Sequence, residues 1–142
     1  MDLFNLLDTY DYGGVHFGRD AASGMCCIVA IHDTRLGPAI GGCRFLPYDN
    51  ERDAVIDALR LARGMTYKGA LAGLPHGGGK TVIMRPNRMF DRAAIFRSFG
   101  RFIDGLGGRY FTAEDSGTGV EDMEVIRSVT QQVVGTDGGS GD

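Results

Sequence analysis

The chain has 142 residues, with 15 Lys and Arg against 18 Asp and Glu, and its net charge of -3 forms no basic block. This length suits one domain with a hydrophobic core, and the charge disfavours nucleic acid or an anionic membrane as a partner. The sequence has no apolar run near the roughly 20 residues that span a bilayer, and the N-terminus "MDLFNLLDTY" is acidic where a secretory signal would be basic. We therefore expect a soluble, cytoplasmic protein.

The cysteines and histidines do not suggest a metal site. They are Cys26, Cys27, Cys43, His16, His32 and His76. Their spacing matches neither a disulfide framework nor a zinc site, so we expect the cysteines to be small buried side chains in a reducing cytosol. The 23 glycines are about twice the usual share. Their clustering predicts places where backbone segments approach closely.

The first half of the chain predicts a short helix, a hairpin and a long helix. The expected elements are a helix at 2–7, strands at 15–17 and 25–33 joined by a turn at Ser23–Gly24, and a turn with a candidate strand at 35–45. In the segment that follows, Asn50 is a suitable N-cap, and apolar residues recur at 54, 55, 58, 59 and 62. This segment is the clearest helix in the sequence.

The second half alternates strands and helices. The expected elements are strands at 70–74 and 80–84, a helix within 87–108 with apolar residues at 90, 93, 96, 99 and 103, a strand at 109–113, and a last helix that opens with a Thr118–Glu121 capping box. The pattern predicts a single three-layer α/β domain, with a central mixed, mostly parallel sheet flanked by helices. We expect this domain to cover residues 1–135, and the Gly/Asp/Ser-rich residues 136–142 to begin an interdomain linker.

The stretch "KGALAGLPHGGGKTVI", residues 68–83, raises the question of a phosphate-binding loop. A P-loop needs a glycine five residues before its Gly-Lys-Thr, and that position is Leu74. The β-branched run after Lys80, closed by Pro86, also predicts a strand where a P-loop would start a helix. A dinucleotide fingerprint fails too, because Asp122 stands where the last glycine after Gly117-x-Gly119 belongs. We expect no cofactor-binding residues in this chain.

Two lysines in this stretch suggest another chemistry. If Lys68 and Lys80 line one pocket, each disfavours protonation of the other, and desolvation adds to the effect. One lysine could anchor a carboxylate while the other acts as a base. The pattern alone is also compatible with solvated loop lysines, and Glu114–Asp115 with a solvated or capping carboxylate pair.

Three blocks, in this order and spacing, carry a resemblance: "GPAIGGCRF", "ALRLARGMTYKGALAGLPHGGGKTVI" and "FTAEDSGTGVEDM". The chain resembles the glutamate, leucine, phenylalanine and valine dehydrogenase family, most closely its leucine branch. In that family an N-terminal α/β domain binds the amino acid and forms subunit contacts, and a C-terminal Rossmann domain binds NAD. The resemblance covers the first domain only, with the active site in the cleft between the two.

The resemblance implies roles for three charged residues. Lys68 matches the lysine that pairs with the substrate carboxylate, and Lys80 matches the catalytic lysine. Asp115 matches the carboxylate that shuttles a proton at the substrate nitrogen. Hydride transfer to NAD gives an iminium that water attacks, and a lysine of lowered pKa could take a proton from that water.

The resemblance also implies a substrate wall. Gly41 and Gly42 match the tight backbone beside the substrate, and Met65 matches a pocket-wall position, although core packing explains Met65 equally well. Ile40 stands where glutamate-specific members carry a lysine, so a second substrate carboxylate would be left unpaired. We expect a branched or otherwise apolar L-amino acid, oxidatively deaminated to its 2-oxo acid. Cys43 and His76 depart from the leucine dehydrogenase pattern, and we expect His76 to be a satisfied loop histidine.

The part that the resemblance does not cover limits the activity we expect. Without a Rossmann domain, in cis or in trans, the isolated chain should neither bind NAD nor turn over. An alternative is a free-standing binding or assembly module that keeps the fold without chemistry. The intact set of Lys68, Lys80 and Asp115 favours the enzyme fragment.

Two further expectations concern assembly and local geometry. The family role in subunit contacts implies a homo-oligomer, with the apolar segments at 3–7 and 25–31 as candidate contact surfaces. Residues 68–80 should form a strand-turn-strand whose glycines border the substrate cleft. In that arrangement, Gly78→Val should damage the cleft more than the core.

Overall fold

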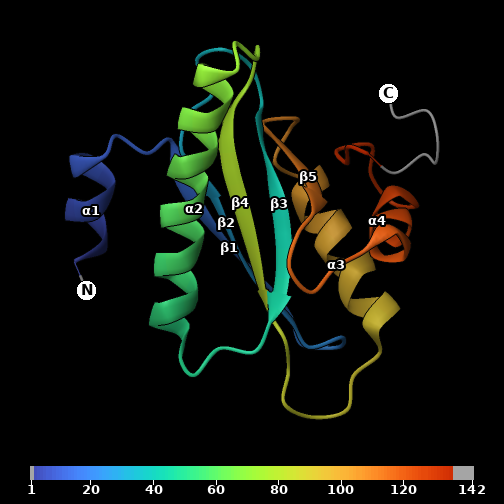
Figure 1. The fold of residues 1–142 in the computed structure, drawn as a ribbon. Helices are drawn as coiled ribbons and strands as arrows, with labels where there is room; N and C mark the ends of the chain where they lie inside the picture. Colours follow the sequence, from blue (N-terminus) through green and yellow to red (C-terminus); the bar gives the residue numbers. More distant parts are fainter. Residues whose placement is uncertain (1, 136–142) are drawn as a thin grey trace.

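The computed structural model describes residues 2–135 and forms an α/β domain (Figure 1). Its elements in chain order are α1 (Leu3–Thr9), β1 (Gly14–Asp20), β2 (Met25–Ile31), β3 (Ala39–Leu46), α2 (Glu51–Leu71), β4 (Gly77–Met84), α3 (Arg92–Asp104), β5 (Tyr110–Glu114) and α4 (Val120–Arg127). The expected alternation of strands and helices is confirmed. Residues 136–142, where we expect a linker, lie outside the described residues.

The five strands form one mixed sheet in the order β1-β2-β4-β3-β5. β1 and β2 form the expected antiparallel hairpin, and β2 also pairs antiparallel with β4. β3 pairs parallel with both β4 and β5. The sheet is mixed, as predicted, but it is not mostly parallel, because two of its pairings are parallel and two are antiparallel. β5, which carries the residues before Asp115, is an edge strand.

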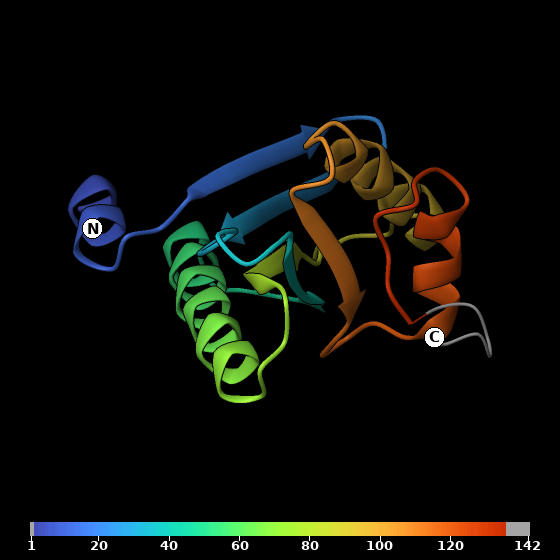
Figure 2. The same cartoon turned by 90° about the horizontal axis from the view of Figure 1, so that it is seen from above.

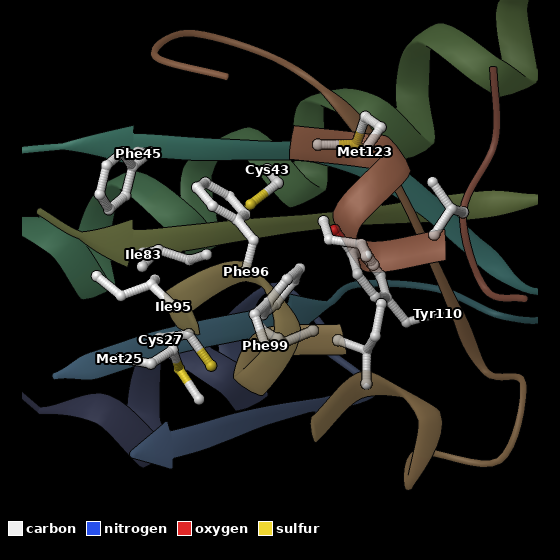
Figure 3. Close-up of a cluster of buried hydrophobic side chains, with 14 of the residues drawn as sticks. Met25, Cys27, Cys43, Phe45, Ile83, Ile95, Phe96, Phe99, Tyr110 and Met123 are labelled. Atoms are coloured by element: carbon white, nitrogen blue, oxygen red, sulfur yellow. The ribbon is translucent and has the colours of Figure 1, made fainter. Parts of the chain in front are cut away.

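One face of the sheet is covered by α3 and α4 and holds the larger core (Figure 3). Side chains alternate between the two faces of a strand, so Cys27, Cys43 and Ile83 point to this side. They meet Phe96 and Phe99 of α3, both fully buried. Burying side chains of this kind contributes about 1.5–3 kcal/mol each. This face therefore supplies much of the hydrophobic stabilisation.

The other face is covered by α2, which packs mainly on β4 and β2. Its apolar residues Ala58, Leu59 and Ala62 meet Ile28 and Val82 in a second, smaller core. In the view from above, α2 lies on one side of the sheet and α3 and α4 on the other, while α1 projects beyond the layers (Figure 2). Since α2 does not extend over β5, the β3–β5 half of this face is only partly covered.

The chain between α2 and β4 differs from the prediction. The strand expected at 70–74 is not present, because α2 continues through the helix-forming Ala70 to Leu71 and ends at a turn in which Gly73 has φ +72°. The glycines at 77–79 lie within β4 itself. The stretch is therefore helix-turn-strand, and the expected strand-turn-strand is wrong.

The caps of two helices illustrate how well local sequence rules work here. Asn50 caps α2 as predicted, its side chain accepting from the N–H of Asp53 at 2.9 Å. α4 begins one residue later than the predicted Thr118 cap. Gly119 is the N-cap, and its N–H donates to the carboxylate of Asp122 at 3.0 Å. The Thr118 hydroxyl is engaged elsewhere, which explains the difference.

The two candidate contact surfaces have different positions. β2 is an inner strand covered on both faces, so the segment at 25–31 cannot serve as an exposed contact surface. In α1 no residue is fully buried, and Phe4 is 80% exposed. Among the described residues, no helix is both long enough and apolar enough to cross a membrane.

Candidate active site

Lys80 points to the α2 side of the sheet because of its place in β4. Val82, two residues on, packs under α2, while Thr81 and Ile83 face the opposite side. The period of two along a strand therefore places Lys80 on the same face as Val82. The lysine is only 6% exposed. A buried ammonium group needs a partner.

Asp115 provides that partner. Its Oδ2 lies 2.7 Å from Nζ of Lys80. The carboxylate comes directly after β5, and the Thr118 hydroxyl fixes the turn there, accepting from the N–H of Asp115 and donating to the carbonyl of Cys43, both at 2.9 Å. A Cβ on Gly42 would stand 2.6 Å from that of Asp115, so only glycine allows this approach.

A second cation reaches the same carboxylate oxygen. Nε of Arg44 donates to Oδ2 of Asp115 at 2.7 Å. Partial burial alone would raise the pKa of Asp115, but the hydrogen bonds from Lys80 and Arg44 outweigh it, so the pKa lies below its ordinary value. Asp115 is therefore held as a carboxylate.

The glycines of β3 pack against other backbone segments. A Cβ on Gly41 would overlap the carbonyl oxygen of Gly79 on β4. On the α3 side of the sheet, the hydroxyl of Tyr110 donates to the carbonyl of Gly41 at 2.8 Å. Ile40 precedes these glycines and is half-buried on the α2 side, opposite Phe111 of β5. The tight backbone that the sequence suggested is present.

Lys68 and Met65 lie on α2. Lys68 is exposed and Met65 is half-buried. Asp57, earlier on α2, contacts Arg44 of β3. Lys68 follows Asp57 by 11 residues, about three helical turns, and Met65 follows it by 8. Both residues therefore lie on the flank of α2 that borders the β3–β5 half of the sheet.

The expected role of the β4 glycines is wrong. A Cβ on Gly78 would overlap the backbone of α2 at Thr66 and stand 2.5 Å from the carbonyl oxygen of Ala62. A Cβ on Gly77 would overlap the carbonyl oxygen of Asp33. These glycines let α2 and the loop before β3 pack against β4. Gly78→Val would therefore damage the helix-sheet packing first.

The two departures from the leucine dehydrogenase pattern have structural explanations. Cys43 is buried on the α3 side, and burial raises the pKa of its thiol. His76 packs on Gly69 of α2, and its Nδ1 lies 3.1 Å from the carbonyl of Gly77. Both positions are compatible with packing roles. Cys27 is buried as expected, but Cys26 is exposed, so the expectation of a buried side chain is wrong for Cys26.

Two residues of this site were missed from the sequence, Arg44 and Phe111. Strand alternation could have found Arg44, since it follows Gly42 by two residues and shares its face. Phe111 lies opposite Ile40 only because β3 and β5 pair in parallel. That pairing cannot be read from either segment alone.

An apolar hollow of about 210 Å³ lies elsewhere, between β1, β2 and the start of α2. Phe17, Cys26 and Val55 are among its lining residues, and it includes neither Lys80 nor Asp115. The charged pair belongs to the partly covered half of the sheet face.

The structure thus brings Lys80, Asp115 and Arg44 together beside the glycines of β3 on an α/β domain. The comparisons with known proteins name the family. Residues 15–132 match the model of the "Glu/Leu/Phe/Val dehydrogenase, dimerisation domain". The chain belongs to this family.

Its relatives include leucine and valine dehydrogenases. The chain is 58% identical to a leucine dehydrogenase of Geobacillus stearothermophilus over 95% of its own length and 37% of the relative. It is 48% identical to a valine dehydrogenase of Streptomyces albus, over 99% of its length and 40% of the relative. The chain therefore spans about two-fifths of the curated relatives it matches.

A solved structure is similar to this chain in sequence and in fold. The L-tryptophan dehydrogenase of Nostoc punctiforme is 43% identical with a TM-score of 0.87, covering 93% of this chain and 39% of that one.

Proposed function

We propose that this chain is the substrate-binding and oligomerisation domain of an NAD-dependent dehydrogenase that deaminates an apolar L-amino acid to its 2-oxo acid. The observation that carries the proposal is the buried Lys80–Asp115 pair, 2.7 Å apart on the partly covered half of the sheet. The similarity to leucine, valine and tryptophan dehydrogenases supports the same reaction class.

The proposed roles follow from charge and position. Lys68, exposed on the α2 flank, pairs with the substrate carboxylate. Asp115 accepts a proton at the substrate nitrogen. Lys80 takes a proton from the attacking water and later returns one. The cofactor, held by a domain outside this chain, accepts hydride from the α-carbon.

An apolar substrate side chain fits the wall beside this pair. Ile40 and Phe111 lie opposite each other on β3 and β5, and both are half-buried. A second carboxylate placed there would lose its water without gaining a partner. This supports a branched or aromatic side chain over that of glutamate.

The remaining parts of the proposal concern assembly. A homo-oligomer accords with the dimerisation domain that the family model describes. We also propose a cytoplasmic location and an NAD domain supplied in cis or in trans. A free-standing module without chemistry is less favoured, because it gives no reason to keep the buried Lys80–Asp115 pair.

The test joins this chain to the remainder of the Geobacillus leucine dehydrogenase and follows NAD reduction with leucine. Lys80→Ala should lower kcat by on the order of 10²–10⁴, since Lys80 acts on protons moved during the reaction. Lys68→Ala should mainly raise KM, because the substrate carboxylate is charged throughout. The isolated chain should show no turnover.

Arg35→Ala serves as the matched control. It removes an exposed cation paired with Asp33, away from the Lys80–Asp115 pair. Equal losses from Lys80→Ala and Arg35→Ala would contradict the assigned roles. So would a Lys80→Ala enzyme that retains full kcat.

A further inference from the structure

Asp115 has two cationic partners, and both bind the same oxygen. Nζ of Lys80 comes from β4 and Nε of Arg44 from β3, each 2.7 Å from Oδ2. Neither cation contacts Oδ1, and the N–H of Ser116 also hydrogen-bonds the carboxylate. Both cations thus anchor the carboxylate through the same oxygen.

Arg44 is itself held by a second carboxylate. Its Nη1 lies 3.4 Å from Oδ2 of Asp57 on α2. The hydroxyl of Tyr48 donates to that same Asp57 oxygen at 2.6 Å, and Arg60 reaches the other at 3.2 Å. Arginine suits this bridge because its planar fork donates in two directions at once. The structure thus contains a continuous chain of alternating charges from Lys80 to Asp57.

The two cations on Asp115 differ in what else they must do. In the proposed reaction Lys80 exchanges protons with water, so its contact with Asp115 must loosen during turnover. Arg44 stays charged at any working pH, because a guanidinium does not lose its proton in proteins. It is also fixed at its far end by Asp57. Arg44 can therefore hold Asp115 when Lys80 cannot.

We infer that Arg44 is a positioning residue of the proposed reaction: it keeps the Asp115 carboxylate in place while Lys80 engages the substrate, and Asp57 fixes Arg44 for this task. The inference rests on the proposed roles of Lys80 and Asp115. The groups that face Asp115 are Lys80 of β4, Arg44 of β3, and the N–H of Ser116 and hydroxyl of Thr118 from its own turn.

The first experiment uses the chain as it is. The Asp115 carboxyl carbon is titrated by NMR and assigned with Asp115→Asn. Arg44→Met should move the pKa of Asp115 upward, toward its ordinary value. Arg44→Lys keeps a charge but loses the fork, so it should move the pKa less. Asp57→Asn should raise the pKa of Asp115 by less than Arg44→Met does, because it releases only the far end of Arg44.

Arg60→Met is the matched control. Arg60 shares Asp57 with Arg44, but it is 69% exposed and makes no contact with Asp115. It should leave the Asp115 titration unchanged. An unchanged titration in Arg44→Met, or an equal shift in Arg60→Met, would overturn the inference. If circular dichroism shows that Arg44→Met does not fold, Arg44→Lys and Asp57→Asn take its place. An upward shift of the Asp115 pKa in both variants supports the inference, and no shift in either overturns it.

The second experiment uses the enzyme joined to the Geobacillus cofactor domain. Arg44→Met should lower kcat on the order of 10- to 100-fold with little change in KM, because Asp115 is misplaced and substrate binding is not. The acid limb of its pH profile should move to higher pH. A loss of thermal stability with an unchanged pH profile would make Arg44 merely structural. An inactive parent enzyme with an intact NMR response would refute the proposed function and leave the contact role of Arg44 standing.

Discussion

The two faces of the sheet are covered to different extents, and adjacent residues of β4 show the contrast. Thr81 faces α3, where its hydroxyl donates to Tyr110 at 2.8 Å in a fully buried setting. Lys80 faces α2, where it meets a carboxylate at the border of a partly covered area. One face is closed by two helices and holds the larger core. The other is covered by one helix that stops short of β5.

This difference shows how the burial of apolar and charged side chains is distributed between the two faces. A fully covered face gains stability from each apolar side chain that it buries. That face also holds an ion pair, in which Nε of Arg92 on α3 lies 2.8 Å from Oδ1 of Asp122 on α4 and the arginine side chain is 42% exposed. On the half-covered face Lys80 is almost fully buried, and the Asp115 side chain with which it pairs is 21% exposed. The predictions below test this division.

The largest loss of unfolding free energy should come from Gly78→Ala, at the contact between β4 and α2. Its Cβ would overlap the backbone at Thr66, and the backbone cannot move without lifting α2. We expect a loss of about 4 kcal/mol or more in unfolding free energy, at the severe end for overpacking. Urea unfolding would measure it.

Gly64→Ala is the control, because the added Cβ would meet no atom within 4 Å apart from its chain neighbours and the adjacent backbone of α2. Within α2 this change should stabilise by about 0.5–1 kcal/mol through helix propensity. Similar destabilisation by both variants would show that the tight contact at Gly78 is not the cause.

The next effect compares one residue type on the two faces. Phe99 of α3 is fully buried in the larger core, whereas Phe17 of β1 is 58% exposed on the α2 side. Phe99→Ala should cost about 3–4 kcal/mol and Phe17→Ala less than about 1 kcal/mol. Thermal or urea unfolding measures both. Comparable losses would mean that the α2 side contributes more to stability than its burial suggests.

The smallest expected effect is on the pH dependence of the unfolding free energy. The pKa of Asp115 is lowered from its ordinary 3.8 because the hydrogen bonds from Lys80 and Arg44 outweigh burial. A depressed carboxyl pKa contributes stability that is fully present above the unfolded value and is lost as pH falls through the folded value. Unfolding free energy should therefore decline as pH drops below about 4, and Asp115→Asn should make that decline shallower.

Glu124→Gln is a suitable reference for the pH experiment, since Glu124 is an exposed carboxylate on α4. It removes the same charge type from the surface on the other side of the sheet. If both variants flatten the acid limb equally, the cation pair around Asp115 does not produce the effect.

Much of the fold could be predicted from local sequence. The order of strands and helices, the β1–β2 hairpin and the Asn50 cap all depend on residues near one another in the chain, and the structure confirms them. The misplaced strand at 70–74 shows the limit. Ala70 and Leu71 are good helix formers, and α2 continues through them to Leu71.

The sequence by itself determined the elements, the family resemblance and the candidate residues Lys68, Lys80 and Asp115, because periodicity and motif spacing are properties of the chain. Only the tertiary structure decided that Gly78 serves helix packing and that Arg44 reaches Asp115, 71 residues later. Such contacts depend on which strands pair and on how far α2 extends over the sheet. Those are outcomes of packing between distant segments, and no local pattern encodes them.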